Sequence, residues 1–125
     1  MDNAELKEYK LLNEIISETG LLLYEYNSAT GRILWSGNTE RVTGYSKSEL
    51  SEFDIKMWIG NIHPDDVSEI ENQQKIIVNG KRAFILKYRF QNKNGNYLML
   101  QDSGVAFVDG EGKEFREIGR IEVIK

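Results

Sequence analysis

The last third of the chain alternates between apolar and polar residues, and this pattern restricts it to folds that contain a long-stranded sheet. Between residues 81 and 92 four large apolar side chains fall at every second position: Phe84, Leu86, Tyr88 and Phe90. Such a period of two places all four side chains on one face of a strand. A sheet with one apolar face therefore has to be covered by other parts of the chain.

Two turn signals divide the rest of this region into further strands. Asn94-Gly95 predicts a tight hairpin turn in which Gly95 has a positive φ, and residues 97–108 then form a second strand. Asp109 to Gly112 predicts another turn before a third strand over residues 115–124.

The first third of the chain predicts a helix and then a hairpin. Residues 2–19 are amphipathic at helical spacing and end at the left-handed stop Gly20, with these apolar members: Tyr9, Leu11, Leu12, Ile15 and Ile16. Residues 21–27 and 32–36 are rich in β-forming side chains and flank a turn at residues 28–31. We expect a flanking helix over residues 1–20 and one compact domain over residues 21–125.

The middle of the chain carries signals for helix starts. Asn38 is expected to cap one short helix, and Ser46 with Glu49 forms a capping box for another. The run from His63 to Asp66 opens a longer helix, because Pro64 suits its first position and the acidic pair faces the positive end of the helix dipole.

That longer helix is expected to end at Asn79-Gly80, with one face formed by Val67, Ile70, Gln74 and Ile77. Asp65 and Asp66 also raise the question of a catalytic or metal-binding pair. Adjacent residues of a first helical turn point in different directions, so dipole capping is the better interpretation.

Composition excludes several classes of function. The 125 residues form one modest core, and 16 basic against 20 acidic residues leave no positive surplus for nucleic acid. The chain has no cysteine, which excludes disulfides and thiolate metal sites. Without an apolar run of signal-peptide or membrane-spanning length a cytoplasmic setting is expected. If the chain is part of a larger protein, a membrane anchor would lie outside it.

Several short motifs follow one another in a fixed order over roughly residues 21–124: Tyr24 to Asn27, Gly31 to Trp35, Thr43 to Ser46, Glu49, Leu50, Trp58, Ile62 to Asp66, Tyr88 to Phe90, Asn94, Gly95 and Gly119. Together these residues resemble the PAS fold, in the subgroup whose helix opens on His-Pro-Asp-Asp. The resemblance implies an α+β domain, a five-stranded antiparallel sheet in the order 2-1-5-4-3 with short helices over one face.

The resemblance also implies a function. Such domains precede output modules such as histidine kinases or diguanylate cyclases, pass a signal through terminal helices, and are commonly homodimers. The domain itself would not be an enzyme. Members often end in Asp-Ile-Thr, whereas this chain has Val123-Ile124-Lys125, which leaves open how a signal leaves the domain.

Neither flavin nor haem is expected as a cofactor. Flavin photoreceptors of this superfamily carry a cysteine near residues 53–59 and a polar amide on the last strand, whereas this chain has no cysteine and has Ile121 at the amide position. Haem needs an axial ligand, and His63 is the one histidine. His63 is fully explained as part of a helix start, and neither a ligand role nor a pH switch is needed.

Twelve residues are candidates for lining a mostly apolar cavity for a small organic ligand: Tyr24, Tyr26, Trp35, Met57, Trp58, Ile62, Ile70, Phe84, Leu86, Tyr88, Met99 and Ile121. The alternative is that these bulky side chains fill the space as an ordinary core. The inward assignments depend on strand alternation, which a shift of one residue reverses.

Three functions follow from these observations. The first is a sensory and dimerisation module that regulates a fused output domain, with Leu12, Ile15 and Ile16 covered by a second copy or by the outer face of the sheet. The same helix could instead pack only on its own domain. The second is a constitutive protein-interaction module without a ligand. The third is a small-molecule enzyme on a similar curved sheet, for which no paired titratable groups are evident.

Overall fold

The computed structural model describes residues 1–124, and Lys125 lies outside the described residues. The elements in chain order are these: α1 (Asn3–Thr19), β1 (Leu22–Asn27), β2 (Arg32–Gly37), α2 (Thr39–Thr43), α3 (Lys47–Ser51), α4 (Ile55–Gly60), α5 (Pro64–Glu71), β3 (Lys81–Gln91), β4 (Tyr97–Val108) and β5 (Glu114–Val123). The five strands form one sheet in the order β2-β1-β5-β4-β3, and every neighbouring pair is antiparallel. The expected sheet order is confirmed.

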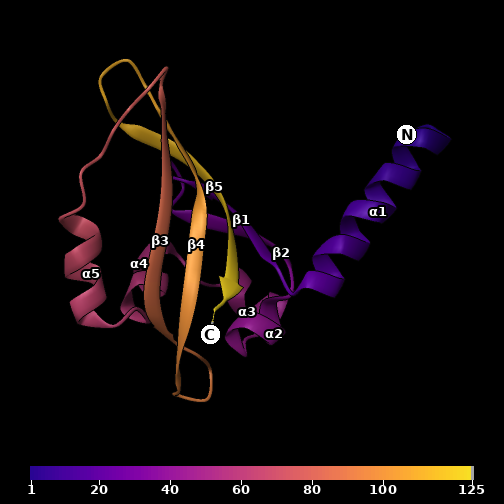
Figure 1. Cartoon of the computed structure of the whole chain (residues 1–125), viewed down its shortest axis with the longest axis horizontal. Coiled ribbons are helices and arrows are strands. Elements are labelled where there is room, and N and C mark those ends of the chain that lie inside the picture. Colours follow the sequence, from indigo (N-terminus) through magenta and orange to yellow (C-terminus); the bar gives the residue numbers. More distant parts are fainter. Residues whose placement is uncertain (125) are drawn as a thin grey trace.

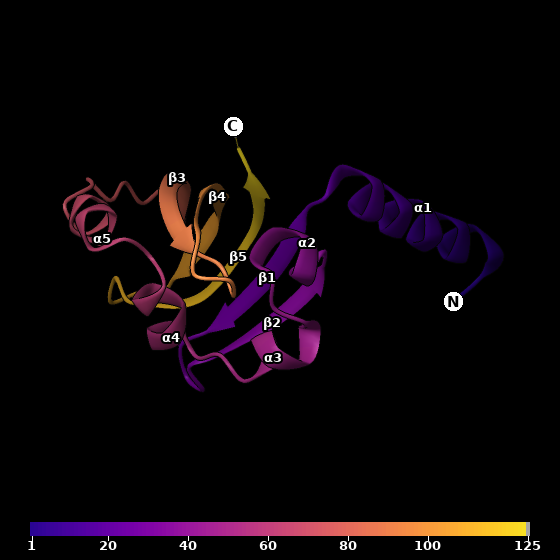
Figure 2. The same cartoon turned by 90° about the horizontal axis from the view of Figure 1, so that it is seen from below.

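The sheet is curved, and helices α2 to α5 lie along one of its faces (Figures 1 and 2). The inward positions of β3 are those expected from the alternation, since Phe84, Tyr88 and Phe90 are buried and Leu86 is half-buried. Leu50 of α3 and Trp58 of α4 close the same core from the helical side. The end of the sheet around Phe90 is therefore closely packed, as an ordinary protein core is.

Three local signals form as expected. Gly20 ends α1 in the left-handed conformation, with φ 71°. Ser46 and Glu49 form the capping box of α3. Gly95 has φ 85° in the β3–β4 turn, where a residue with a side chain would be strained.

Helix α5 ends at Glu71 and not at Asn79-Gly80, so the expected helix is too long. Ile77 is largely exposed and forms no helical face with Val67 and Ile70. Strand β3 begins at the opposite end of the sheet from α5, and residues 72–80 run between them as an irregular segment (Figure 1). An extended segment covers about 3.3 Å per residue, whereas a helix covers about 1.5 Å. If α5 continued as a helix through residues 72–80, it would therefore be too short to reach the start of β3.

Asn38 does not cap α2 with its side chain, contrary to expectation. Its Nδ2 donates to the carbonyl oxygens of Ile16 at 2.7 Å and Leu21 at 3.0 Å. The amide thus fixes the end of α1 to the first turn of the domain. Beyond this junction α1 projects away from the sheet and buries no residue (Figures 1 and 2).

Candidate functional site

A cavity of about 380 Å³ lies between the sheet and helices α4 and α5. It is on the side of the sheet where β3 begins, away from the packed core around Phe90. Every expected lining residue except Met57 and Met99 borders it: Tyr24, Tyr26, Trp35, Trp58, Ile62, Ile70, Phe84, Leu86, Tyr88 and Ile121. The concave face is thus hollow at one end and filled at the other.

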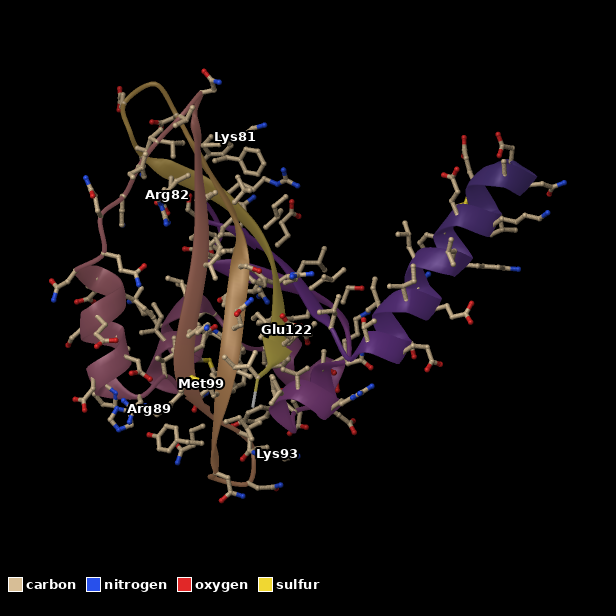
Figure 3. The ribbon with its side chains drawn as sticks, in the orientation of Figure 1. Lys81, Arg82, Arg89, Lys93, Met99 and Glu122 are labelled. Carbon is tan, nitrogen blue, oxygen red and sulfur yellow. The ribbon has the colours of Figure 1, made fainter. Side chains whose placement is uncertain are left out.

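The assignments of Met57 and Met99 are wrong. Met99 is 40% exposed and pairs with Arg89 on the outer face of the sheet, one residue away from the inward Leu100. Met57 is 47% exposed, whereas the next residue of α4, Trp58, is buried. Figure 3 shows Met99 on the lower part of the sheet. In both cases the neighbouring residue occupies the inward position.

A buried carboxylate, Asp102 of β4, is the centre of the polar side of the cavity. The Tyr24 hydroxyl donates to Oδ1 at 2.8 Å and the Tyr88 hydroxyl donates to Oδ2 at 2.7 Å. The Trp58 indole N–H in turn donates to the Tyr88 oxygen at 3.2 Å. Asp102 is 7% exposed, and burial raises its pKa to about 6 even though the two phenols stabilise the charged form.

Glycine at position 119 allows this cluster to form. Tyr24 is directly opposite Gly119 on the neighbouring strand, and a β-carbon there would stand 2.6 Å from the Tyr24 hydroxyl oxygen. The phenol therefore crosses over β5 and reaches Asp102 on the strand beyond it. A side chain at position 119 would displace the ring and break the contact.

A second carboxylate, Glu117 of β5, borders the same cavity. Its Oε2 lies 3.3 Å from the Tyr24 hydroxyl. Burial, followed by the nearby charge of Asp102, raises the pKa of Glu117 to about 7. Two carboxylates that share one phenol are unusual, because each one disfavours the charge on the other.

The sequence interpretation missed both carboxylates. Asp102 occupies an inward position of β4, in phase with the buried Leu100 and Ala106, and Glu117 lies opposite Tyr26 on the concave face. An acidic residue in phase with buried apolar neighbours is a signal that the alternation of β4 contained. Their shared contact with Tyr24 is set by the sheet order and is not visible in local sequence.

His63 has the structural role expected of it. Its Nδ1 accepts the N–H of Asp65 at the start of α5, and its ring lies beside that of Tyr97. His63 does not belong to the residues that border the cavity.

Asp66 does more than face the helix dipole. It accepts the backbone N–H of Arg89 at 2.7 Å and two guanidinium N–H groups at 3.0 and 2.9 Å. These contacts join α5, which contains Asp66, to β3, which contains Arg89 (Figure 3). The hydrogen bonds from Arg89 lower the pKa of Asp66 to about 2.

Fold and site together define a small sensor domain with a ligand-sized cavity behind an antiparallel sheet. The family model described as the PAS fold matches residues 32–121. The chain therefore belongs to the PAS fold family, a family of sensor domains, and the domain itself is not catalytic. Among curated protein sequences no significant match is found.

Solved structures of signalling proteins share this fold. A sensory box histidine kinase/response regulator from Burkholderia thailandensis has a TM-score of 0.67 and 22% identity, with 90% of this chain and 83% of that chain covered. The N-terminal domain of a diguanylate cyclase with PAS/PAC sensor from Marinobacter aquaeolei has a TM-score of 0.63 and 18% identity, covering 82% and 94%.

A third similar structure is the Cycle PAS-B domain of Drosophila melanogaster with bound ethylene glycol. Its TM-score is 0.61 at 18% identity, with 82% of this chain and 99% of that chain covered. At these identities the likeness establishes the fold alone. In residues 1–124 no helix has the length and apolar character needed to cross a bilayer.

Proposed function

We propose that this chain is the sensory domain of a multidomain signalling protein of the histidine kinase or diguanylate cyclase type. It detects a small organic ligand in the cavity and passes the signal on through its dimeric state. The cavity carries this proposal, because its 380 Å³ volume and mixed aromatic and polar lining are those of a ligand pocket.

The lining offers both of the features that a pocket needs. Aromatic rings supply apolar surface, with Trp35 and Trp58 only 4.9 Å apart between ring centroids. Asp102 and Glu117 supply polar groups that fix orientation. A constitutive interaction module would have no use for buried carboxylates beside an empty volume, since filling the space with apolar side chains would be more stable.

Native mass spectrometry of the purified full chain tests the ligand. We expect an additional mass that is released on unfolding, or that appears when a metabolite mixture is added. A chain that binds no small molecule under either condition contradicts the ligand and leaves the constitutive module as the better description.

The proposed route for the signal is α1. Its apolar side chains are exposed to solvent, with Leu12 59% and Ile15 46% exposed. The Ile16 side chain contacts the rest of the domain near Gly37. An isolated helix of this length is marginal without packing. We propose that a second copy covers this stripe, either with its own α1 or with the outer sheet face where Leu34 is 68% exposed.

Sedimentation of the wild type and of the double variant Leu12→Asp/Ile16→Asp tests the dimer. We expect the wild type to dimerise at micromolar concentration and the variant to be a folded monomer. A Lys7→Asp/Lys10→Asp variant alters charge on the same helix without touching the stripe and serves as the control. A wild type that remains monomeric at high micromolar concentration removes this part of the proposal.

The proposed ligand is neither flavin nor haem. His63 caps the start of α5 with its Nδ1. The apolar Ile121 occupies the position on the last strand where flavin photoreceptors carry a polar amide. We therefore expect a colourless protein. A stoichiometric visible absorbance band would overturn this expectation.

A further inference from the structure

The two cavity carboxylates have no cationic partner among residues 1–124. Two cations border the cavity without forming an ion pair with either carboxylate: Lys75, and Arg82 at the start of β3 (Figure 3). The Nε of Arg82 donates to Glu114 at 2.7 Å, and its guanidinium lies 5.5 Å from the centre of the Phe84 ring. Buried charges are ordinarily paired within the protein. Asp102 is buried and Glu117 is half-buried, and neither forms an ion pair, although the charge of Arg82 acts on Glu117 from a distance.

The hydrogen-bond donors within the cluster are too few for both carboxylates. Tyr24 has a single hydroxyl proton, which it gives to Asp102 at 2.8 Å, so at 3.3 Å it serves Glu117 poorly. Among residues 1–124 no hydrogen bond reaches Oε1 of Glu117. Each oxygen of Asp102 accepts one phenol and retains a second lone pair. The pair can therefore accept further donors from outside the chain.

A further buried polar group on the cavity wall lacks a partner. The Trp35 side chain is 4% exposed and borders the cavity, yet its indole N–H has no hydrogen-bond acceptor among residues 1–124. An unsatisfied buried donor costs free energy, and in native proteins it commonly marks an absent ligand or water. The cavity thus lacks donors at one place and an acceptor at another.

We propose that the cavity binds a small organic ammonium ion whose body carries a hydrogen-bond acceptor. The cationic head lies between Asp102 and Glu117, the apolar body lies against the rings of Trp35 and Trp58, and the acceptor receives the Trp35 N–H. This assignment rests on the proposed sensory function and specifies its ligand.

Other ligand classes fit these contacts less well. An anion would face two carboxylates in a space of low dielectric, where repulsion between like charges is strong. A hard metal ion requires about six oxygen ligands, whereas most of this wall is indole, phenyl and aliphatic. A neutral molecule fills the volume but leaves the carboxylate charge uncompensated. Aromatic faces, by contrast, attract organic cations.

Three probes of one shape and different charge test the assignment on the full chain: phenethylamine, phenethyl alcohol and hydrocinnamate. Binding is measured by calorimetry, and tryptophan fluorescence locates it because both tryptophans of the chain border the cavity. At about pH 8, where both carboxylates are ionised, we expect the amine to bind at least about tenfold more tightly than the alcohol. The acid should not bind measurably.

Two matched variants separate the effect of the Glu117 carboxylate from the effect of the net charge of the protein. Glu117→Gln should reduce amine affinity about tenfold and leave alcohol affinity unchanged. Glu122→Gln makes the same chemical change on the outward side of β5, as Figure 3 indicates, and should change neither. An equal loss in both variants would mean that net charge, and not the cavity pair, attracts the amine, and would overturn the proposal.

A separate experiment tests the hydrogen-bond acceptor that we propose on the ligand. Para-methoxyphenethylamine should bind more tightly than phenethylamine to the wild type, and Trp35→Phe should remove that advantage while it retains phenethylamine binding. Equal binding of the two amines to the wild type would overturn the role of Trp35.

Failure of this inference is distinct from failure of the proposed function. If the alcohol binds as tightly as the amine and both quench the tryptophans, the cavity is a ligand site for neutral molecules and the ammonium assignment is wrong. If neither these probes nor a metabolite mixture perturbs tryptophan fluorescence, ligand sensing and the ammonium assignment both fail.

Discussion

Asp66 and the pair Asp102 and Glu117 are acidic groups with opposite surroundings. Asp66 lies at the junction of α5 and β3, with three donors from Arg89 and a side chain 13% exposed. Asp102 accepts two phenols, Glu117 shares one of them, and neither forms an ion pair among residues 1–124. The first arrangement is complete within the chain. The second lacks a counter-charge, which we propose that a ligand supplies.

This difference separates a structural carboxylate from a binding one. A structural carboxylate has a lowered pKa because the folded chain stabilises its charge, as Arg89 does for Asp66. The carboxylates that we propose bind a ligand, Asp102 and Glu117, have raised pKa values because the loss of water outweighs the hydrogen bonds that the folded chain provides. The direction of the pKa shift thus follows from the contacts.

The largest effect is expected from Asp66→Ala. Loss of the carboxylate leaves the Arg89 backbone N–H and guanidinium without their acceptor, which should lower the free energy of unfolding by about 2 to 3 kcal/mol. Urea denaturation measures this change. Asp65→Ala is the control, because the side chain of Asp65 is 82% exposed and its loss should cost below about 0.5 kcal/mol. Equal effects would mean that Asp66 acts only on the helix dipole.

The pH dependence of stability should have opposite signs in the two regions. The raised pKa of Glu117, about 7 against an ordinary 4.5, means that the folded chain holds a proton that the unfolded chain releases. Its stabilising contribution is present below the ordinary pKa, and on the order of 2 kcal/mol is lost as pH rises to about 7. The contribution of Asp66 is present above its ordinary pKa of 3.8 and is lost as pH falls towards about 2.

Thermal melts of the wild type and Glu117→Gln from acid to neutral pH check the first of these trends. The difference in melting temperature between the two proteins should change across this interval and be constant above it. A difference that is the same at all pH values would show that Glu117 titrates normally and is not part of the buried pair.

A smaller effect is expected from Tyr88→Phe. The change removes one donor to Asp102 and the acceptor of the Trp58 N–H, while the ring still fills its buried place. We expect a loss of about 1 to 2 kcal/mol in unfolding free energy, together with a further rise in the pKa of Asp102. Chemical denaturation and carboxyl NMR titration measure the two quantities. For Tyr26→Phe, whose hydroxyl has no recorded hydrogen bond, no comparable loss is expected.

The smallest effect is expected from Glu114→Gln. Without the Glu114 charge, Arg82 is free to turn towards Glu117, which should lower the pKa of Glu117 and weaken amine binding about threefold. The free energy of unfolding should change by below about 1 kcal/mol, because the Glu114 side chain is 35% exposed and water can replace part of the lost contact. Unchanged amine affinity would show that Arg82 does not turn towards Glu117.

Local sequence was sufficient to predict most of the fold. Alternation over β3 determined which of its side chains face inward, and Gly20, Gly95 and the Ser46–Glu49 capping box marked turns and ends correctly. These features depend on backbone sterics and on hydrogen bonds between residues a few positions apart, which short motifs encode. The order of motifs was likewise enough to indicate the family that matches residues 32–121.

Only the tertiary structure decided where helix α5 ends and what the polar side of the cavity contains. The irregular segment after α5 follows from the distance to the start of β3, which no local signal records. Asp102 and Glu117 meet at Tyr24 because β5 lies between β1 and β4 and because Gly119 lets a phenol cross it. Their burial and their missing counter-charge are properties of three strands brought together, since solvation of a charge depends on everything packed around it.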